Sequence, residues 1–249
     1  MINIILFFQL YNDFFEDATH GVILFSLGYT GFSAKDIPKD VVEALVDAFA
    51  QLEQKVIMRF DPGVLPYVPK NVLVSNWVPQ QDLLAHPKTV AFFTHGGIGS
   101  ILESIYYGVP MIVSGIFADQ VDNAAIIDDI GVAYKLDKSD LNDAVKIVHA
   151  ISKVVENDST YKVRSLELSA MWKDKPISPT EEATMWIERL LKHKTLRHLR
   201  MEQHDLALWQ YFSLDVILFI LGILGLLMGI IKRLFKRLLT SQKLKTKAD

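Results

Sequence analysis

The sequence predicts an α/β fold with a doubly wound parallel sheet, followed by one helix that spans a membrane. Short apolar runs alternate with segments of helical periodicity, which is typical of a sheet whose strands are joined by helices. One of these runs, residues 89–93, leads through a glycine turn into a helical segment. Near the C-terminus, residues 216–231 contain no charged side chain. These three observations indicate one sheet domain and one membrane anchor.

The first part of the predicted sheet lies between residues 21 and 75. Residues 21–26, 56–60 and 72–75 are short apolar runs typical of buried parallel strands. Pro38 suits a helix start, and the apolar side chains after it recur at helical spacing: Val41, Val42, Leu45, Val46, Phe49 and Leu52. We therefore expect three strands here, with a helix between the first two.

The centre of the chain is the strand–helix unit at residues 89–106. Its apolar run ends in Thr94-His95-Gly96-Gly97 and passes into a helix. Such a turn binds phosphate, because glycine lets the backbone approach the ligand and the unpaired N–H groups of the helix favour negative charge. A second unit, with residues 110–115 as its strand, brings Asp119 and Gln120 to the same edge. These two strand ends favour a polar pocket for a sugar nucleotide over a structural turn.

After the second unit the sequence predicts four helices, at residues 122–130, 141–155, 161–172 and 179–193. Residues 1–20 are expected to form an irregular leader, because their apolar start lacks the basic region and the cleavage site of a signal peptide. The predicted sheet domain covers residues 21–200 and includes the last helices. Residues 201–213 then form a juxtamembrane segment.

A membrane-spanning helix is predicted at residues 214–231. Trp209 lies at one end of this stretch and Lys232 at the other, as expected for the two interfaces of a single-pass helix. A buried core helix would not need so uniform an apolar surface beside a basic tail. An amphipathic surface helix would need a polar face, which this stretch lacks.

Composition agrees with this organisation. The 249 residues, half of them hydrophobic, suffice for one α/β domain and an appendage. The tail, residues 232–249, holds seven Lys or Arg and one acidic residue, so its net charge is +6 and that of the body is −9, within a total of −3. An acidic body argues against nucleic acid as a partner. The chain has no cysteine, which excludes disulfides and thiol chemistry.

Three motifs at the predicted edge are specific when taken together: Trp77-x-Pro79-Gln80, His95-Gly96-Gly97 and Asp119-Gln120. They resemble the signature of the UDP-glycosyltransferases, and the similarity runs from about residue 21 through the C-terminus. The resemblance implies a Rossmann-like domain that forms the C-terminal half of the two-domain GT-B fold. Two positions depart from the family pattern, because Tyr29 replaces a serine and Gly99 replaces the asparagine of several branches.

The resemblance assigns the pocket residues to parts of a UDP-sugar. Trp77 would stack on the uracil ring, and Gln80 would hydrogen-bond uracil or ribose. His95 would donate to the diphosphate. Ser100, near the helix start, would either bind phosphate or cap the helix. Glu103 would suit the ribose hydroxyls.

The remaining assignments concern the donor sugar and the loops around it. Asp119 and Gln120 would hold hydroxyls of the donor sugar, and Arg59 matches a strand-end arginine that contacts the nucleotide. Further contacts are expected from Ser26, Gly97 and Gly99. Without the resemblance these residue types have ordinary structural roles, since most tryptophans pack in cores and a carboxylate at a helix N-terminus is favourable in itself.

The function implied by the resemblance is transfer of a hexosyl group from UDP-glucose or UDP-glucuronate to a hydroxyl of a small lipophilic acceptor, with inversion. It implies no metal and no cofactor beyond the UDP-sugar co-substrate. The family's catalytic base is a histidine of the other half, so no catalytic residue is predicted here, and His20 does not match it. The alternatives are a non-catalytic, membrane-tethered UDP-sugar-binding protein that pairs with another chain as a homo- or hetero-oligomer, or a fragment of a full-length enzyme.

The end of the tail suggests where the protein resides. Lys245 and Lys247 resemble a dilysine retrieval signal of endoplasmic-reticulum membrane proteins, which is read in the cytosol. We therefore expect a single-pass protein of that membrane, with a lumenal body and a basic cytosolic tail. In this orientation the sequon Asn157-Asp158-Ser159 can be glycosylated.

Overall fold

A computed structural model describes residues 11–28, 36–156, 159–201 and 205–245. The chain divides into two compact units, Met1–Pro176 and Ile177–Asp249. Several of the predictions above concern positions outside the described residues, namely residues 1–10, Tyr29, Asn157 and residues 246–249.

The first unit is built on one six-stranded sheet in which all neighbouring strands are parallel. In chain order its strands are β1 (Val22–Ser26), β2 (Lys55–Arg59), β3 (Val72–Ser75), β4 (Thr89–Thr94), β5 (Met111–Val113) and β6 (Ala133–Lys135). Their order in the sheet is β3-β2-β1-β4-β5-β6, so the direction of winding reverses between β1 and β4. The doubly wound sheet is thereby confirmed. The edge strand β6 is absent from the prediction, because three residues carry too little periodicity.

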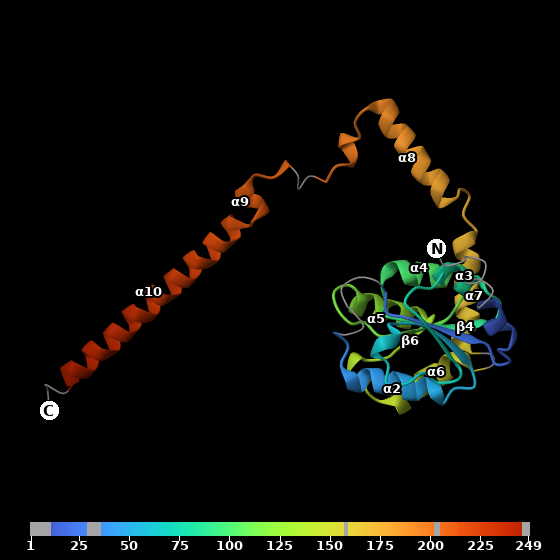
Figure 1. Ribbon diagram of the computed structural model, residues 1–249. Helices are drawn as coiled ribbons and strands as arrows, with labels where there is room; N and C mark the ends of the chain where they lie inside the picture. The colour runs from blue at the N-terminus through green and yellow to red at the C-terminus, as the bar shows by residue number, and fades with distance from the viewer. Residues whose placement is uncertain (1–10, 29–35, 157–158, 202–204, 246–249) are drawn as a thin grey trace. The chain divides into compact units, whose positions relative to one another are not determined.

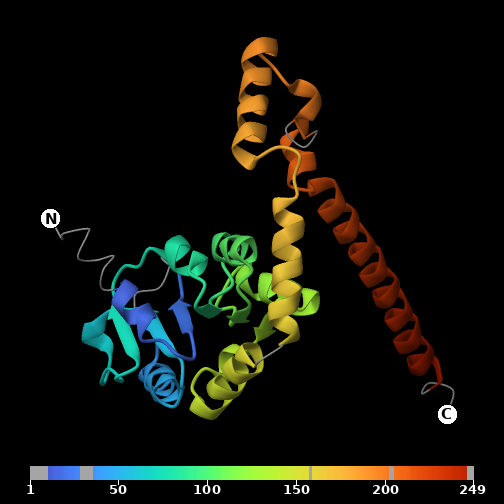
Figure 2. The ribbon, with the colours of Figure 1, turned by 90° about the vertical axis from the view of Figure 1, so that its right-hand side faces the viewer.

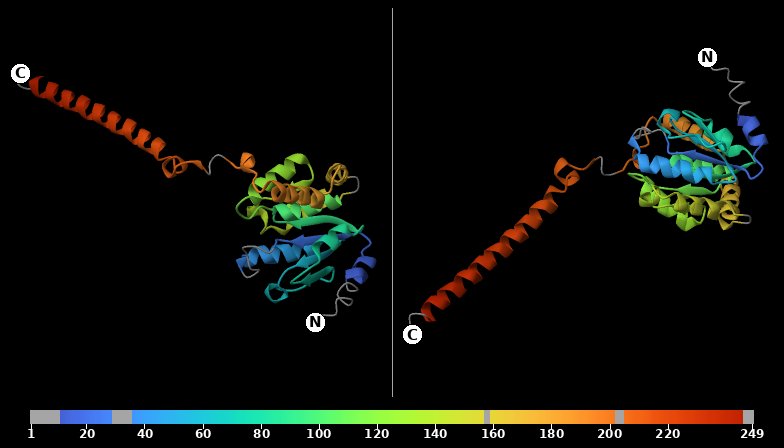
Figure 3. Two further views of the ribbon diagram at one scale, coloured as in Figure 1. Left: turned by 90° about the horizontal axis from the view of Figure 1, so that it is seen from above. Right: turned by 60° about the horizontal axis from the view of Figure 1, so that its bottom comes forward.

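Helices cover both faces of this sheet (Figures 1 and 3). One face carries α2 (Lys39–Ala50) and α6 (Ala144–Val155), and the other carries α3 (Gln80–Ala85), α4 (Ile98–Tyr107), α5 (Gln120–Ile130) and α7 (Thr160–Lys173). Successive side chains of β1 enter opposite cores, since Phe25 packs with α2 and α6 while Leu24 packs with α3, α4 and α5. On the second face α7 packs against α4 (Figure 2).

Two helices differ from the prediction: the start of α6 is set by a side chain, and α3 is too short to be recognised. The helix α6 begins at Ala144 instead of residue 141, because the carboxylate of Asp143 accepts hydrogen bonds from the backbone N–H groups of Val145 and Lys146. The preceding residues form the short 3-10 helix η3 (Lys138–Asp140). The six-residue helix α3 is missing from the prediction, since a single turn and a half shows no clear periodicity.

The prediction of an irregular leader over residues 1–20 is wrong for its described part, because residues 11–16 are helical. Tyr11 and Phe15 lie one turn apart, are each 2% exposed, and pack in the core beside α3 and α4. One such pair is too weak a pattern to indicate a helix, and a helix this short is stable only through packing.

The second unit begins before the predicted domain of residues 21–200 ends, so that boundary is wrong. The helix α8 (Pro179–His193) lies where the sequence predicts it and starts with a capping box between Ser178 and Glu181. It nevertheless belongs to the second unit, and all its residues are exposed. Helical periodicity gives the position of a helix but not the core in which it packs.

The C-terminal helix is longer than predicted. After the 3-10 helix η4 (Arg197–Leu199) and the short α9 (Leu208–Tyr211), α10 (Leu214–Lys245) begins at the predicted residue. Its segment Leu214–Lys236 is long and apolar enough to cross a membrane. The helix does not stop at residue 231, because the Lys, Arg and Leu of the following segment are strong helix formers.

Candidate functional site

The predicted ligand-binding residues all lie at or after the carboxyl ends of strands, on both sides of the point where the winding reverses. On the β1 side these residues are Ser26, Arg59, Trp77 and Gln80. On the β4 side they are His95, Gly97, Gly99, Ser100, Glu103, Asp119 and Gln120. In open parallel sheets the crevice at such a reversal is where ligands bind.

The imidazole of His95 is fixed between two glycine backbones. A Cβ atom added to Gly28 would lie 2.5 Å from the His95 ring, and one added to Gly97 would lie 2.6 Å from its Nε2 atom. The hydroxyl of Thr94 lies 3.3 Å from Nδ1, and the residue is only 6% exposed. Glycine is therefore needed at both positions, because any larger side chain would displace the ring.

Burial lowers the pKa of His95 from its ordinary value; the negative charge of Asp119 opposes this shift, and the positive charge of Arg59 adds to it. The imidazole is therefore neutral at pH 7, and a neutral imidazole still offers one N–H donor. Asp119 follows β5 and Arg59 ends β2, so charges from two other strand–helix units act on this imidazole.

The lowered pKa predicts that this unit loses stability as the pH falls. Unfolded histidine binds a proton near pH 6.5, whereas folded His95 does so only at lower pH, so stability falls from about pH 6.5 down to the folded pKa and then levels off. We expect the His95→Gln variant to lose less stability than the wild type between pH 7.5 and 5.5. Urea denaturation in detergent at both pH values measures the stability of each protein, and equal losses of stability in the variant and the wild type would contradict this expectation.

Gln80, Ser100 and Glu103 form one hydrogen-bonded cluster, although they come from two separate helices. The amide nitrogen of Gln80 donates to Glu103 Oε2 at 2.7 Å and to Ser100 Oγ at 3.2 Å. The amide nitrogen of Gln81 donates to Glu103 Oε1 at 3.1 Å. Both carboxylate oxygens of Glu103 are thus held in place, so the group is already oriented before a ligand arrives.

The indole of Trp77 is 56% exposed, so it is not a core side chain. The loop that carries it is held through the backbone, because Ser75 Oγ donates to the Trp77 carbonyl at 2.6 Å and the hydroxyl of Tyr11 donates to the same oxygen at 3.4 Å. A large, exposed aromatic ring on a fixed backbone is a suitable stacking surface for a flat ligand.

Arg59 and Ser26 contact the turn after β1. The guanidinium of Arg59 donates to the Gly28 carbonyl at 2.6 Å, and Ser26 Oγ accepts from the Gly28 N–H at 3.4 Å. Ser26 is 1% exposed, so its hydroxyl orders the turn. Arg59 lines a cavity of about 160 Å³, together with Leu27, Gly28, Ile37, Phe60, Asp61, Asn76 and Ile116. Nucleotide contacts by these two side chains stay predictions.

Asp119 and Gln120 lie at the start of α5 but differ in exposure. Gln120 is 5% exposed, and its Oε1 atom accepts hydrogen bonds from the backbone N–H groups of Ile116 and Phe117, both at 3.2 Å. A sugar contact from this residue would therefore have to use its amide nitrogen. The carboxylate of Asp119 accepts a hydrogen bond of 3.0 Å from the amide nitrogen of Asn123.

Sequence reasoning missed two residues of the site. Asn123 also donates to the Gly96 carbonyl at 3.1 Å and so joins the glycine turn to Asp119. Its spacing of four residues from Asp119 on one helix face was the available signal. The second, Gln81, has no comparable signal, because its contact with Glu103 depends on how two helices pack.

The start of α4 excludes one of the two roles considered for Ser100, that of the helix cap. Gly97 takes the N-cap position and α4 begins at Ile98, so Ser100 lies in the first turn and does not cap the helix. Gly99 faces open space, since an added Cβ would meet no atom within 4 Å. In the described part of the chain, no three His, Asp or Glu side chains converge into a possible metal site.

Comparison with known proteins identifies the family. A family model described as UDP-glucoronosyl and UDP-glucosyl transferase matches residues 9–247. The chain belongs to this family. It is 40% identical over 202 residues to UDP-glucuronosyltransferase 2B7 of Homo sapiens, and the aligned stretch covers 81% of this chain and 37% of the relative. It is 42% identical over 214 residues to UDP-glucuronosyltransferase 2B18 of Macaca fascicularis, and this alignment covers 86% of this chain and 40% of the relative. The chain thus spans about two fifths of the length of these UDP-glucuronosyltransferases.

Solved glycosyltransferase structures show the same fold. CalG4, the calicheamicin glycosyltransferase, aligns with a TM-score of 0.60 and 25% identity, over 72% of this chain and 45% of that protein. A UDP-glucose: anthocyanidin 3-O-glucosyltransferase in complex with UDP aligns with a TM-score of 0.61 and 22% identity, over 71% and 42%. The predicted Rossmann-like half of a GT-B fold is confirmed. Together with the apolar helix α10, family membership indicates a membrane-anchored protein.

Proposed function

We propose that this chain is the donor-binding part of a membrane-anchored UDP-glycosyltransferase. The observation that carries the proposal is the hydrogen-bonded cluster of Gln80, Ser100 and Glu103 at the winding reversal, with the exposed Trp77 three residues before Gln80 in the chain. An exposed flat ring and a fixed carboxylate at the same edge of the sheet suit a nucleoside, because the uracil would stack on the ring while the ribose hydroxyls donate to Glu103.

The turn after β4 would bind the diphosphate. The N–H groups at the start of α4 and the neutral imidazole of His95 would stabilise the negative charge that develops as UDP departs. The bond between the anomeric carbon and the phosphate oxygen breaks as the acceptor oxygen attacks from the opposite side, which inverts the configuration. The acceptor proton then passes to a base that the described residues do not supply.

The donor sugar would lie near Asp119, whose carboxylate Asn123 orients. The names of the relatives favour UDP-glucuronate over UDP-glucose as the donor. A hydroxyl of a small lipophilic molecule is the proposed acceptor, which agrees with an enzyme held at a membrane. The proposal requires no metal or further cofactor, and its proposed partners are the UDP-sugar, the acceptor, the membrane and a further chain in a homo- or hetero-oligomer.

Isothermal titration of the full chain in detergent tests the donor site. We expect Trp77→Ala to weaken UDP binding roughly 30-fold, since a base–aromatic stack contributes about 2 kcal/mol. Trp186→Ala is the matched control, because this indole is also exposed but lies on α8. Asp119→Ala should weaken UDP-glucuronate binding more than UDP binding. Unchanged UDP affinity in folded Trp77→Ala would overturn the proposed site.

We further propose an endoplasmic-reticulum location with a lumenal body and a cytosolic tail. The basic residues from Lys232 onward favour the cytosolic side of a membrane. Protease added to intact microsomes should then remove only the tail, whereas detergent should expose the whole body to digestion. Digestion of the body in intact microsomes would contradict this orientation.

A further inference from the structure

The helical segment at residues 11–16 contacts the loop of the stacking tryptophan. Tyr11, at the start of the segment, is 2% exposed, and its hydroxyl donates to the Trp77 carbonyl at 3.4 Å. The same carbonyl accepts the Ser75 hydroxyl at 2.6 Å. Two hydroxyl groups therefore fix one backbone oxygen of an otherwise exposed loop, and one of them comes from a segment far away in the sequence.

The same segment also contacts the far end of α3. The ring of Phe15 stacks on the ring of His86, with centroids 3.7 Å apart and planes inclined by 22°. His86 is the C-cap residue of α3, the helix that begins with Gln80. The segment thus touches both ends of residues 77–86, the stretch that carries the two proposed uracil contacts.

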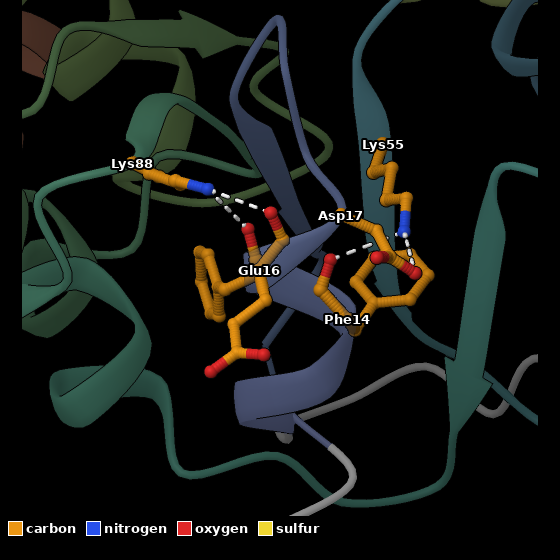
Figure 4. A network of polar contacts seen from close by, with 6 residues as sticks. Phe14, Glu16, Asp17, Lys55 and Lys88 are labelled. Carbon is orange, nitrogen blue, oxygen red and sulfur yellow. Dashed lines mark hydrogen bonds and ion pairs between the residues drawn. The ribbon is translucent and has the colours of Figure 1, made fainter.

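The C-terminal end of the segment is attached to the sheet by two lysines (Figure 4). Lys88 Nζ donates to the carbonyls of Phe15 and Glu16 at 2.8 and 2.9 Å. Lys55 Nζ donates to the Phe14 carbonyl at 3.2 Å and lies 4.6 Å from the Phe14 ring centroid. The last carbonyls of a helix have no partner within the helix, and positive charge there is favourable, so each ammonium group acts as a C-cap.

We propose that residues 11–16 are a brace that holds Trp77 and Gln80 in position and thereby sets the affinity of the uracil subsite. The inference rests on the proposed function. The Trp77 residue is 56% exposed and α3 has only six residues, so contacts from elsewhere in the chain contribute to the order of this stretch. Without the brace the stretch would have to be ordered when the nucleotide binds, and that entropic cost would appear as weaker binding. Tyr11 is thus a positioning residue that acts through Trp77.

The test replaces single groups of the brace in the full chain in detergent. Tyr11→Phe keeps the buried ring and removes the hydroxyl, and Lys55→Met/Lys88→Met keeps the aliphatic stems and removes both caps. We expect UDP affinity to fall about threefold to tenfold in Tyr11→Phe, the factor of one net hydrogen bond, and further in the double variant. The matched controls are Tyr134→Phe, a tyrosine of the opposite core, and Lys146→Met, whose ion pair with Asp140 lies elsewhere. Neither control should change UDP affinity.

A second readout follows Trp77 without any nucleotide. Replacing the other three tryptophans, Trp172, Trp186 and Trp209, by Phe leaves Trp77 as the reporter. Its fluorescence anisotropy should fall in the brace variants while circular dichroism stays unchanged, which a general loss of stability would not produce. If the wild type binds UDP and both folded brace variants bind it equally well, the brace is overturned and the proposed function stands. If the wild type does not bind UDP, the proposed function fails and the inference fails with it.

Discussion

The 249-residue chain, purified in detergent, is expected to bind a UDP-sugar and yet to form glycoside no faster than its His95→Ala variant. All the proposed roles of the described residues concern the donor. Holding the acceptor hydroxyl in line with the anomeric carbon contributes roughly 7–11 kcal/mol, and a positioned base adds a factor of about 10²–10⁴ in rate. Each protein is incubated with a lipophilic phenol and UDP-glucuronate, and chromatography measures the rate at which the glycoside forms.

The control supplies acceptor-binding groups. Adding the part of UDP-glucuronosyltransferase 2B7 that lies outside the region matched here, either fused or as a separate chain, should produce glycoside, and His95→Ala should lower that rate. Glycoside formation by the unsupplemented chain, lost on His95→Ala, would show that acceptor and base sites lie within these residues. Donor binding without any rescued activity would favour the alternative of a non-catalytic UDP-sugar-binding protein.

Replacing Gly115 by alanine is expected to destabilise the first unit by about 3 kcal/mol, the upper end of the range for overpacked cores. An added Cβ would lie 2.7 Å from the Cα of Val121 and 2.8 Å from the carbonyl oxygen of Gln120. These are backbone atoms at the start of α5, so no side chain can rotate to make room. The β5–α5 turn would have to open, and the position of Asp119 would change with it.

Gly99→Ala is the matched comparison, because it lies in the first turn of α4 and meets no atom within 4 Å. Alanine is the better helix former by about 1 kcal/mol, so this variant should be as stable as the wild type or slightly more stable. Urea denaturation in detergent compares the three proteins. Equal midpoints for Gly115→Ala and Gly99→Ala would contradict the crowding seen at the β5–α5 turn.

Much of the sheet can be predicted from the sequence, because buried parallel strands are short apolar runs. Observed β3 coincides with the predicted residues 72–75, and β4 extends the predicted run by one residue, to Thr94. The helix at residues 11–16 and the strand β6 cannot be predicted in this way, since neither is long enough to show a period. Their stability comes from packing against distant residues, which local pattern does not record.

The sequence predicts the candidate site as a set of residues at one edge of the sheet, but it does not predict the contacts between them. Motifs place Gln80 and Glu103 at one edge, whereas the 2.7 Å hydrogen bond between them depends on how α3 packs beside α4. The motif pair of Asp119 and Gln120 suggests similar roles, yet burial separates them, since the Gln120 oxygen stabilises its own turn. Distances between segments that are remote in sequence follow from the fold and cannot be read from spacing.

The central position of β1 affects how this protein folds during its synthesis. In the sheet β1 lies between β2 and β4, but in the chain β4 follows only after β2 and β3. At about 5–20 residues per second, roughly 3 to 14 s pass between synthesis of Ser26 and of its partner Thr94. During that interval β1, a strand whose five residues are all buried in the folded protein, has one edge without a hydrogen-bonding partner, which is the condition under which strands associate with other chains. The pocket-forming edge of the sheet is thus completed late, and until then the nascent chain exposes an unpaired strand edge to which a chaperone can bind.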